Sequence, residues 1–201
     1  MKRGLYAITP DIPDRRKLLD MVLAALEGGL AALQYRCKSL EPSHQVSEAK
    51  ALAAACRARG VPLIFNDNLE LAMAAGADGV HLGKDDGDVA AARAKLKGKL
   101  LGVSCYNSLE AAASAVRAGA DYVAFGSVFT SSTKPNAVRA ELSLFADARA
   151  LGVPLCAIGG ITLQNAPQLV AAGADLLAVI TDLFDAPDIT ARARDYARLF
   201  P

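Results

Sequence analysis

The sequence repeats one kind of junction, at which a helix would end and a strand would begin. The tetrapeptide Ala-Gly-Ala-Asp occurs at residues 75–78, 118–121 and 172–175, each time between an Ala-rich helical stretch and an apolar run. A second tetrapeptide, Gly-Val-Pro-Leu, occurs at residues 60–63 and 152–155 in the same setting. Glycine is favoured just past a helix, where the backbone turns left-handed. These junctions indicate a repeated strand–helix unit.

Eight short apolar runs alternate with helical patterns along the chain. The candidate strands lie near Gly4–Ile8, Ala31–Arg36, Leu63–Asn66, Gly79–Leu82, Leu100–Ser104, Tyr122–Phe125, Leu155–Ile158 and Leu176–Ile180. The candidate helices follow near residues 14–28, 42–59, 68–75, 86–97, 108–118, 140–150, 162–172 and 187–199. Eight alternations predict an α/β fold, a compact (β/α)8 TIM barrel that forms a single domain over residues 1–201. An open doubly wound sheet is the alternative, but it usually has fewer strands, and no GxGxxG follows the first strand.

The composition restricts the partners and the compartment that we expect. The formal net charge is +1, which gives no reason to expect nucleic acid as a partner. No apolar run reaches the roughly 18 residues of a membrane helix. The four cysteines (Cys37, Cys56, Cys105 and Cys156) are scattered, without metal-type spacing and without a preceding signal peptide. We therefore expect reduced thiols in a cytoplasmic protein, with its oligomeric state left open.

The end of the second candidate strand carries an unusual set of polar side chains. Because side chains alternate along a strand, Gln34, Arg36 and Lys38 share one face while Tyr35 and Cys37 face the other way. Two cations and an amide at the carboxyl end of a barrel strand form a good anion-binding site, since active sites lie at that end. The alternative is that these cations lie on the surface and pair with helix carboxylates.

The segment after the sixth candidate strand, residues 126–137, is rich in small hydroxyl residues. Ser131, Ser132 and Thr133 offer hydroxyls and backbone N–H groups beside the cation of Lys134. Hydroxyls, free amides and one lysine after a strand are groups that bind a phosphate ester. An ordinary solvated Ser/Thr loop is the alternative.

Carboxylates follow the third and fourth candidate strands. Asn66, Asp67 and Asp86 would place two carboxylates and an amide at neighbouring strand ends, and such oxygen ligands favour Mg²⁺ bound together with substrate phosphates. The alternative is that Asp67 and Asp86 cap the following helices. The aspartates of the repeated tetrapeptide should lie at the opposite end of the barrel and be structural. His44 and His81 have no evident partner and are also expected to be structural.

A second phosphate-binding region is expected after the last two strands. Gly159 and Gly160 follow the seventh candidate strand, and Ile180 and Thr181 end the eighth. Many barrels bind phosphate here through backbone N–H groups. The sequence therefore predicts two separate anion-binding regions in one site.

Seven short motifs, in the same order and in register from Leu5 to about Thr181, resemble the thiamine phosphate synthase family. Each motif alone carries little information, but the ordered set is highly specific. The motifs are Gln34-x-Arg36-x-Lys38, Phe65-Asn66-Asp67, Gly79-Val80-His81-Leu82-Gly83 with Asp86, Gly102-Val103-Ser104, Ser131-Ser132-Thr133-Lys134-Pro135, Ala157-Ile158-Gly159-Gly160-Ile161 and Val179-Ile180-Thr181.

The resemblance implies a transferase that joins an aminopyrimidine diphosphate to a thiazole phosphate, giving thiamine phosphate and diphosphate. It implies that Ser104 contacts the aminopyrimidine, that Asp67 and Asp86 bind the cofactor Mg²⁺, and that Arg36, Lys38, Lys134 and Ser104 carry the catalysis. The pyrimidine diphosphate would be held by Gln34, Arg36, Lys38, Asn66 and Lys134. The thiazole phosphate would be held by Ser131, Thr133, Gly160, Ile180 and Thr181, with Ser132 beside them.

The reaction implied by the resemblance agrees with the types of residue present. Diphosphate would leave first, and the thiazole nitrogen would then attack the resulting carbocation. Such a substitution needs charge neutralisation and alignment of two substrates, and no general base. The alternatives are a thiazole tautomerase of the sister branch, a non-catalytic regulatory barrel, and an unrelated phosphosugar isomerase on the same fold.

Overall fold

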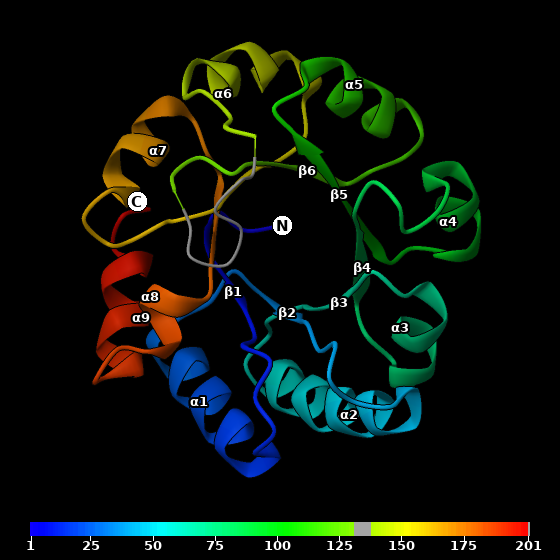
Figure 1. Ribbon diagram of the computed structural model, residues 1–201, viewed down its shortest axis with the longest axis vertical. Coiled ribbons are helices and arrows are strands. Elements are labelled where there is room, and N and C mark those ends of the chain that lie inside the picture. Colours follow the sequence, from blue (N-terminus) through cyan, green and yellow to red (C-terminus); the bar gives the residue numbers. More distant parts are fainter. Residues whose placement is uncertain (131–137, 201) are drawn as a thin grey trace.

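The computed structural model describes residues 1–130 and 138–200, and its strands close into one parallel barrel in the order β1 to β8. Figure 1 shows the strands as an inner ring with the helices arranged around it. The strands are β1 (Gly4–Ile8), β2 (Ala32–Tyr35), β3 (Leu63–Asn66), β4 (Gly79–Leu82), β5 (Leu100–Tyr106), β6 (Tyr122–Phe125), β7 (Leu155–Ile158) and β8 (Leu176–Val179). Since β1 pairs with both β2 and β8, the barrel prediction is confirmed and the open-sheet alternative is wrong.

A helix follows each strand on the outside of the barrel. The helices are α1 (Arg15–Gly28), α2 (Pro42–Ala58), α3 (Leu69–Ala75), α4 (Val89–Lys95), α5 (Leu109–Arg117), α6 (Ser143–Ala148), the 3-10 helix η1 (Arg149–Leu151), α7 (Ala166–Ala172), α8 (Thr181–Phe184) and α9 (Ile189–Ala197). The short helix α8, which begins directly after β8, was not predicted. In the described ranges, none of the helices has both the length and the hydropathy needed to cross a bilayer.

Alternation along the strands divides the core into two layers. In β1, Leu5 and Ala7 pack outward against the helices, whereas Tyr6 and Ile8 point into the barrel. In β2, Leu33 packs outward and Ala32 inward in the same way. The outer layer joins strands to helices, and the smaller inner layer leaves one end of the barrel free for polar groups.

The repeated aspartates fasten neighbouring strands together at the N-terminal end of the barrel. The carboxylate of Asp78 accepts a hydrogen bond from the Leu63 amide at 2.8 Å, and that of Asp121 accepts one from the Leu101 amide at 2.8 Å. Asp175 receives the Leu155 amide at 3.1 Å in the same arrangement. The glycines two residues earlier all have positive φ, between 70° and 108°. The prediction that these aspartates are structural is confirmed.

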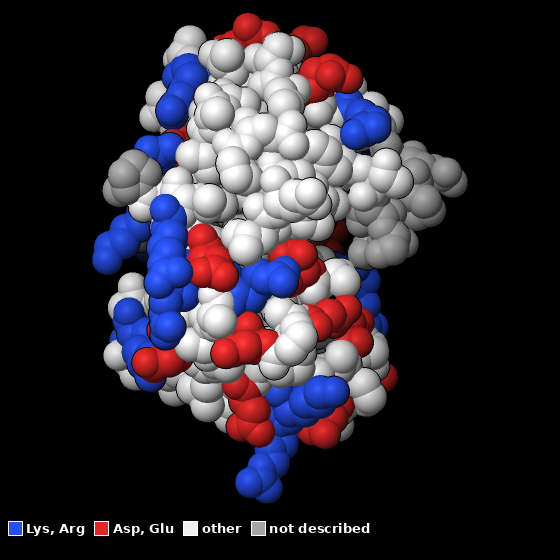
Figure 2. All heavy atoms as spheres, turned by 90° about the vertical axis from the view of Figure 1, so that its left-hand side faces the viewer, with Lys and Arg blue, Asp and Glu red and all other residues white. Residues whose placement is uncertain are grey.

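The first and last long helices pack side by side and cover the closure of the barrel. The Thr190 hydroxyl of α9 donates a hydrogen bond to the Ala24 carbonyl of α1 at 3.0 Å. A side chain at Gly28 would overlap the backbone of Thr190, so glycine is needed for this close approach. Figure 2 shows this side of the molecule, where Lys and Arg interleave with Asp and Glu and form no broad patch of one sign.

Candidate active site

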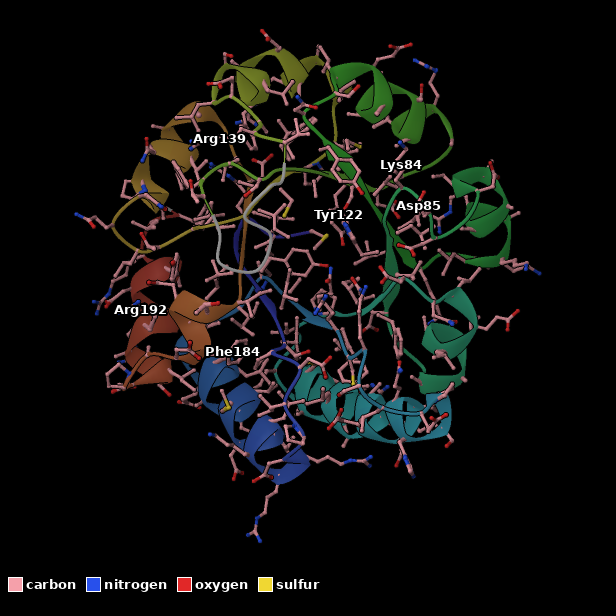
Figure 3. The ribbon with its side chains drawn as sticks, viewed as in Figure 1. Lys84, Asp85, Tyr122, Arg139, Phe184 and Arg192 are labelled. Atoms are coloured by element: carbon pink, nitrogen blue, oxygen red, sulfur yellow. The ribbon has the colours of Figure 1, made fainter. Side chains whose placement is uncertain are left out.

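A cavity of about 600 Å³ lies at the C-terminal ends of the strands. Its walls come from residues on or just after β1 to β8, as the barrel rule predicts. Figure 3 shows Tyr122 inside the ring of strands, and Lys84 and Asp85 beside the loop that follows β4. The polar strand ends chosen from the sequence therefore meet around one space.

The end of β2 presents its polar side chains to this cavity as predicted. Gln34, Arg36 and Lys38 line it, whereas the Tyr35 hydroxyl points outward and donates to a carboxylate oxygen of Glu48 at 2.6 Å. The Lys38 ammonium lies 3.8 Å from an oxygen of Asp67, which is at another strand end. The alternative that Lys38 pairs with a helix carboxylate is therefore wrong.

Asp67 and Asp86 come together at the mouth of the cavity, and neither caps a helix. The N-cap residues are Asn68 for α3 and Asp88 for α4, whose side chains accept backbone N–H bonds at 2.9 and 2.7 Å. Asp67 cannot serve as a cap because its backbone is left-handed, with φ of 65°. Asp86 instead accepts the Gly83 amide at 2.7 Å. The helix-cap alternative is wrong for both carboxylates.

The pair of carboxylates is electrostatically unfavourable in the absence of a cation. Burial raises the pKa of Asp67, and a hydrogen-bonding contact and charge repulsion with Asp86 raise it further. Lys38 and Arg36 lower that pKa, but by less. Over residues 1–130 and 138–200, no third His, Cys, Asp or Glu joins the pair to make a larger metal-binding group. Two accessible carboxylates that repel each other fit Mg²⁺, which commonly uses one or two carboxylates plus substrate phosphates.

Ser104 lines the cavity as predicted, but its main partner was not expected. The Ser104 hydroxyl is 2.9 Å from Nε2 of His81, and the other ring nitrogen of His81 is 3.0 Å from the Tyr122 hydroxyl. His81 is only 7% exposed, and burial lowers its pKa to about 4, so its ring is neutral at physiological pH. His81 also lines the cavity, and the expectation that it has no partner was wrong. The signal that could have placed it there is its alternation with Val80 and Leu82, which pack outward.

The loops after β7 and β8 form the other wall of the cavity. Gly160, Ile180 and Thr181 all line it. Gly160 has φ of 63°, and a Cβ there would overlap the Thr130 carbonyl, so only glycine fits. The amides of Gly160 and Thr181 donate no hydrogen bond to any described residue, which leaves them for an anion in the cavity.

The predicted residues Ser131, Ser132, Thr133 and Lys134 lie outside the residues that the structure describes. Ser127 and Thr130, which precede them, line the cavity. Residues to which the sequence analysis gave no role in the site also lie in its wall, among them Lys84, Asp85 and Tyr106. Tyr106 has φ of 54° and is 42% exposed at the end of β5.

Comparison with known proteins assigns this chain to a family. A family model described as thiamine monophosphate synthase matches residues 5–183. The thiamine-phosphate synthase of Aromatoleum aromaticum is 58% identical over 200 residues, covering 98% of this chain and 96% of that protein. The enzyme of the same name from Methylobacillus flagellatus is 55% identical over 199 residues, covering 98% and 95%.

Solved structures agree with the sequence comparison. The thiamine phosphate pyrophosphorylase from Pyrococcus furiosus superimposes with a TM-score of 0.86 at 32% identity, covering 98% of this chain and 94% of that one. A 3-hexulose-6-phosphate synthase superimposes with a TM-score of 0.72 at 17% identity, covering 100% of both chains, which shows a shared fold alone. On the full-length matches at 55–58% identity, the chain belongs to the thiamine monophosphate synthase family.

Proposed function

We propose that the cavity carries out thiamine-phosphate synthesis as a transfer between two phosphorylated substrates held at opposite walls. The full-length matches identify the activity as that of a thiamine-phosphate synthase, which is a transferase. In the proposed reaction the bond between the pyrimidine methylene carbon and the diphosphate oxygen breaks, and diphosphate leaves with the electron pair. The lone pair of the thiazole nitrogen then forms the new carbon–nitrogen bond.

The diphosphate is assigned to the wall formed by β2, β3 and β4. Arg36 supplies a planar fork of donors and Lys38 a point charge, and both line the cavity with Gln34 and Asn66. Lys134 is added from its place in the sequence motif. These groups neutralise the charge that develops on diphosphate as the bond breaks, which is where electrostatic stabilisation lowers a barrier most.

Mg²⁺ is assigned to Asp67 and Asp86. When bound, the ion would supply further positive charge to the leaving diphosphate. The raised pKa of Asp67 supports this assignment, because a cation between the two carboxylates would remove their repulsion. The left-handed backbone at Asp67 and the bond from Gly83 to Asp86 hold both carboxylates at the mouth of the cavity.

The thiazole phosphate is assigned to the opposite wall, formed by the loops after β7 and β8. The amides of Gly160 and Thr181, which donate to no described residue, support this, together with the Ile180 backbone in the cavity wall. Ser131, Ser132 and Thr133 are added from their place in the sequence motif. Two separated anion sites around one cavity would hold the thiazole nitrogen in line with the pyrimidine methylene carbon. Such alignment replaces a bimolecular encounter and removes the need for a general base.

The single observation that carries this proposal is that one cavity joins the cations of β2 to the carboxylate pair of β3 and β4. A thiazole tautomerase needs neither the diphosphate site nor the metal site, and a non-catalytic barrel has no reason to hold two repelling carboxylates together. The chain is further proposed to act as one catalytic domain over residues 1–201 and to work in the cytoplasm, where its four free cysteines would stay reduced.

The test is to incubate the protein with the pyrimidine diphosphate, the thiazole phosphate and Mg²⁺, and to measure diphosphate release and thiamine phosphate. Release should require both substrates and should stop on chelation of Mg²⁺. Conversion of the thiazole alone would favour the tautomerase, and wild-type rates after chelation would overturn the metal assignment.

A further inference from the structure

A chain of four hydrogen bonds crosses the floor of the cavity and ends at Ser104. Nε2 of Gln34 donates to the Tyr6 hydroxyl at 2.9 Å, and that hydroxyl is 2.7 Å from the Tyr122 hydroxyl. Tyr122 is 3.0 Å from Nδ1 of His81, whose Nε2 is 2.9 Å from the Ser104 hydroxyl. The five residues come from β2, β1, β6, β4 and β5, so every link is a long-range contact inside the barrel.

The chain of hydrogen bonds is held rigidly by packing. Tyr6 and Tyr122 are 1% and 0% exposed, and their rings meet edge to face with centroids 5.8 Å apart. The Tyr122 phenol lies directly against Gly102, where any Cβ would overlap it. The hydroxyls of Tyr6 and Tyr122 are therefore buried deep in the barrel, where a polar group is costly unless it is hydrogen-bonded.

The hydrogen bonds of Tyr6 determine which group donates and which accepts along the chain of hydrogen bonds. Gln34 donates to the Tyr6 oxygen, so the remaining proton of Tyr6 must go to Tyr122, its only other partner among the described residues. The Tyr122 proton must then go to Nδ1 of His81, so Nδ1 is the accepting nitrogen and the His81 Nε2–H donates to Ser104. Ser104 is left to donate its own proton into the cavity, and the Gln34 carbonyl oxygen is left to accept. The reverse direction would bury the Tyr6 proton without an acceptor.

We propose that Tyr6, Tyr122 and His81 are positioning residues that lock the hydroxyl of Ser104 as a donor and the carbonyl of Gln34 as an acceptor. The inference rests on the proposed function and on the contact between Ser104 and the aminopyrimidine that the family resemblance implies. A hydroxyl locked as a donor at Ser104 favours a ring that presents an acceptor nitrogen to it, as the 4-aminopyrimidine does. A 4-oxo ring carries an N–H at that position, which cannot accept the Ser104 proton, and is disfavoured.

The experiment compares two unreactive inhibitors, the monophosphates of the 4-aminopyrimidine and of its 4-oxo counterpart, in competition with the pyrimidine diphosphate. Tyr122→Phe keeps the ring but breaks the chain, so Ser104 can rotate and the Gln34 amide can turn over. The preference for the amino compound should fall about three- to tenfold, the range for one hydrogen bond. Tyr35→Phe, which removes a buried hydroxyl on the outer face of β2, should leave the preference unchanged.

A second pair of variants keeps the test informative if Tyr122→Phe does not fold. In His81→Gln the amide can still donate to Ser104 and accept from Tyr122, so most of the preference should survive. In His81→Phe both bonds are lost, and the preference should fall. If His81 had only a structural role, His81→Gln and His81→Phe would change the preference for the amino compound equally. Alternatively, they would raise the KM of the pyrimidine diphosphate and of the thiazole phosphate to the same extent.

Ser104→Ala separates failure of the relay, which is the chain of four hydrogen bonds from Gln34 to Ser104, from failure of the proposed site. If Ser104→Ala lowers the preference but Tyr122→Phe and His81→Phe do not, the relay is wrong and the pyrimidine assignment stands. If Ser104→Ala also leaves the preference unchanged, the assignment of Ser104 to the pyrimidine is wrong, and the relay inference is overturned with it.

Discussion

Replacing Asp67 by Asn should abolish most activity and at the same time make the protein more stable. The pKa of Asp67 is raised, first by burial and then by Asp86, so the folded protein is destabilised by the charge on this carboxylate. Asn has a similar shape without that charge, and it tolerates the left-handed backbone at φ of 65° at least as well as Asp. The carboxylate is therefore retained for the reaction, at a cost in folding free energy.

The expected magnitudes follow from the contacts of Asp67. Its bond with Lys38 is long, at 3.8 Å, and the Lys38 side chain is 62% exposed, so losing this ion pair costs at most about 1 kcal/mol. The pKa of Asp67 is raised overall, so burial and the repulsion by Asp86 outweigh the two cations, and removing the charge should give a net gain in stability. In a chain of 201 residues each kcal/mol of gain corresponds to a rise in Tm of about 2–4 °C. Turnover should fall at least about a hundredfold, since a metal's charge stabilisation contributes several kcal/mol.

The pH dependence of the stability gained in Asp67→Asn provides a further check that the gain comes from removing the carboxylate charge. Because the folded pKa lies above the ordinary value of 3.8, the wild type loses stability as pH rises from 3.8 through the raised pKa. The Asn variant has no such group. The difference in unfolding free energy between the two should therefore be smallest below pH 3.8 and largest near pH 7.

Thermal melts and steady-state rates, both measured with and without Mg²⁺, test this prediction. Mg²⁺ should raise the Tm of the wild type and have less effect on Asp67→Asn. Asp88→Ala is the matched control, because Asp88 is the real cap of α4: it should lose about 1 kcal/mol of stability and keep its turnover. The reasoning is refuted if Asp67→Asn is less stable than the wild type and turns over at the normal rate.

Three further predictions address other parts of the chain. Lys134→Ala should lower turnover by at least about tenfold without changing Tm, as expected for a cation that contacts the leaving diphosphate; unfolding or a normal rate would contradict it. Ser131→Ala should raise the KM for the thiazole phosphate more than that for the pyrimidine diphosphate, and equal effects would remove Ser131 from the thiazole side. Asp121→Ala should lower the unfolding free energy by about 1–3 kcal/mol in denaturant titrations, since the Leu101 amide and Arg93 lose a shared acceptor, while the folded enzyme keeps its KM values.

The fold and the face of each strand could be predicted because they follow from local periodicity. The alternation that put Gln34, Arg36 and Lys38 on one face is the same alternation that places them in the cavity. The ends of helices and strands were predicted less accurately. The helix expected at residues 162–172 begins at Ala166, and Thr181 starts a short helix instead of ending a strand.

The helix caps and the relay could not be read from the sequence for physical reasons. Asp67 and Asn68 are adjacent and both are good capping residues, and the choice depends on which backbone is extended, a property of the folded turn. His81 finds its partners 23 and 41 residues away, in β5 and β6. Those contacts exist only after the barrel has closed, so no local pattern announces them.

Aspartate occurs at both ends of the barrel, with opposite effects on stability. At the N-terminal end Asp121 accepts an amide and an arginine, both at 2.8 Å, so its charge is compensated and fastens two strands. At the C-terminal end Asp67 faces the carboxylate of Asp86, and the Lys38 ammonium is 3.8 Å away, so the charge of Asp67 is not fully compensated. All eight strands run parallel, so the order of strand and helix along the chain decides at which end a residue falls. Asp121, which precedes a strand, is stabilising, whereas Asp67, which follows one, is left with a charge that a bound cation and substrate can use.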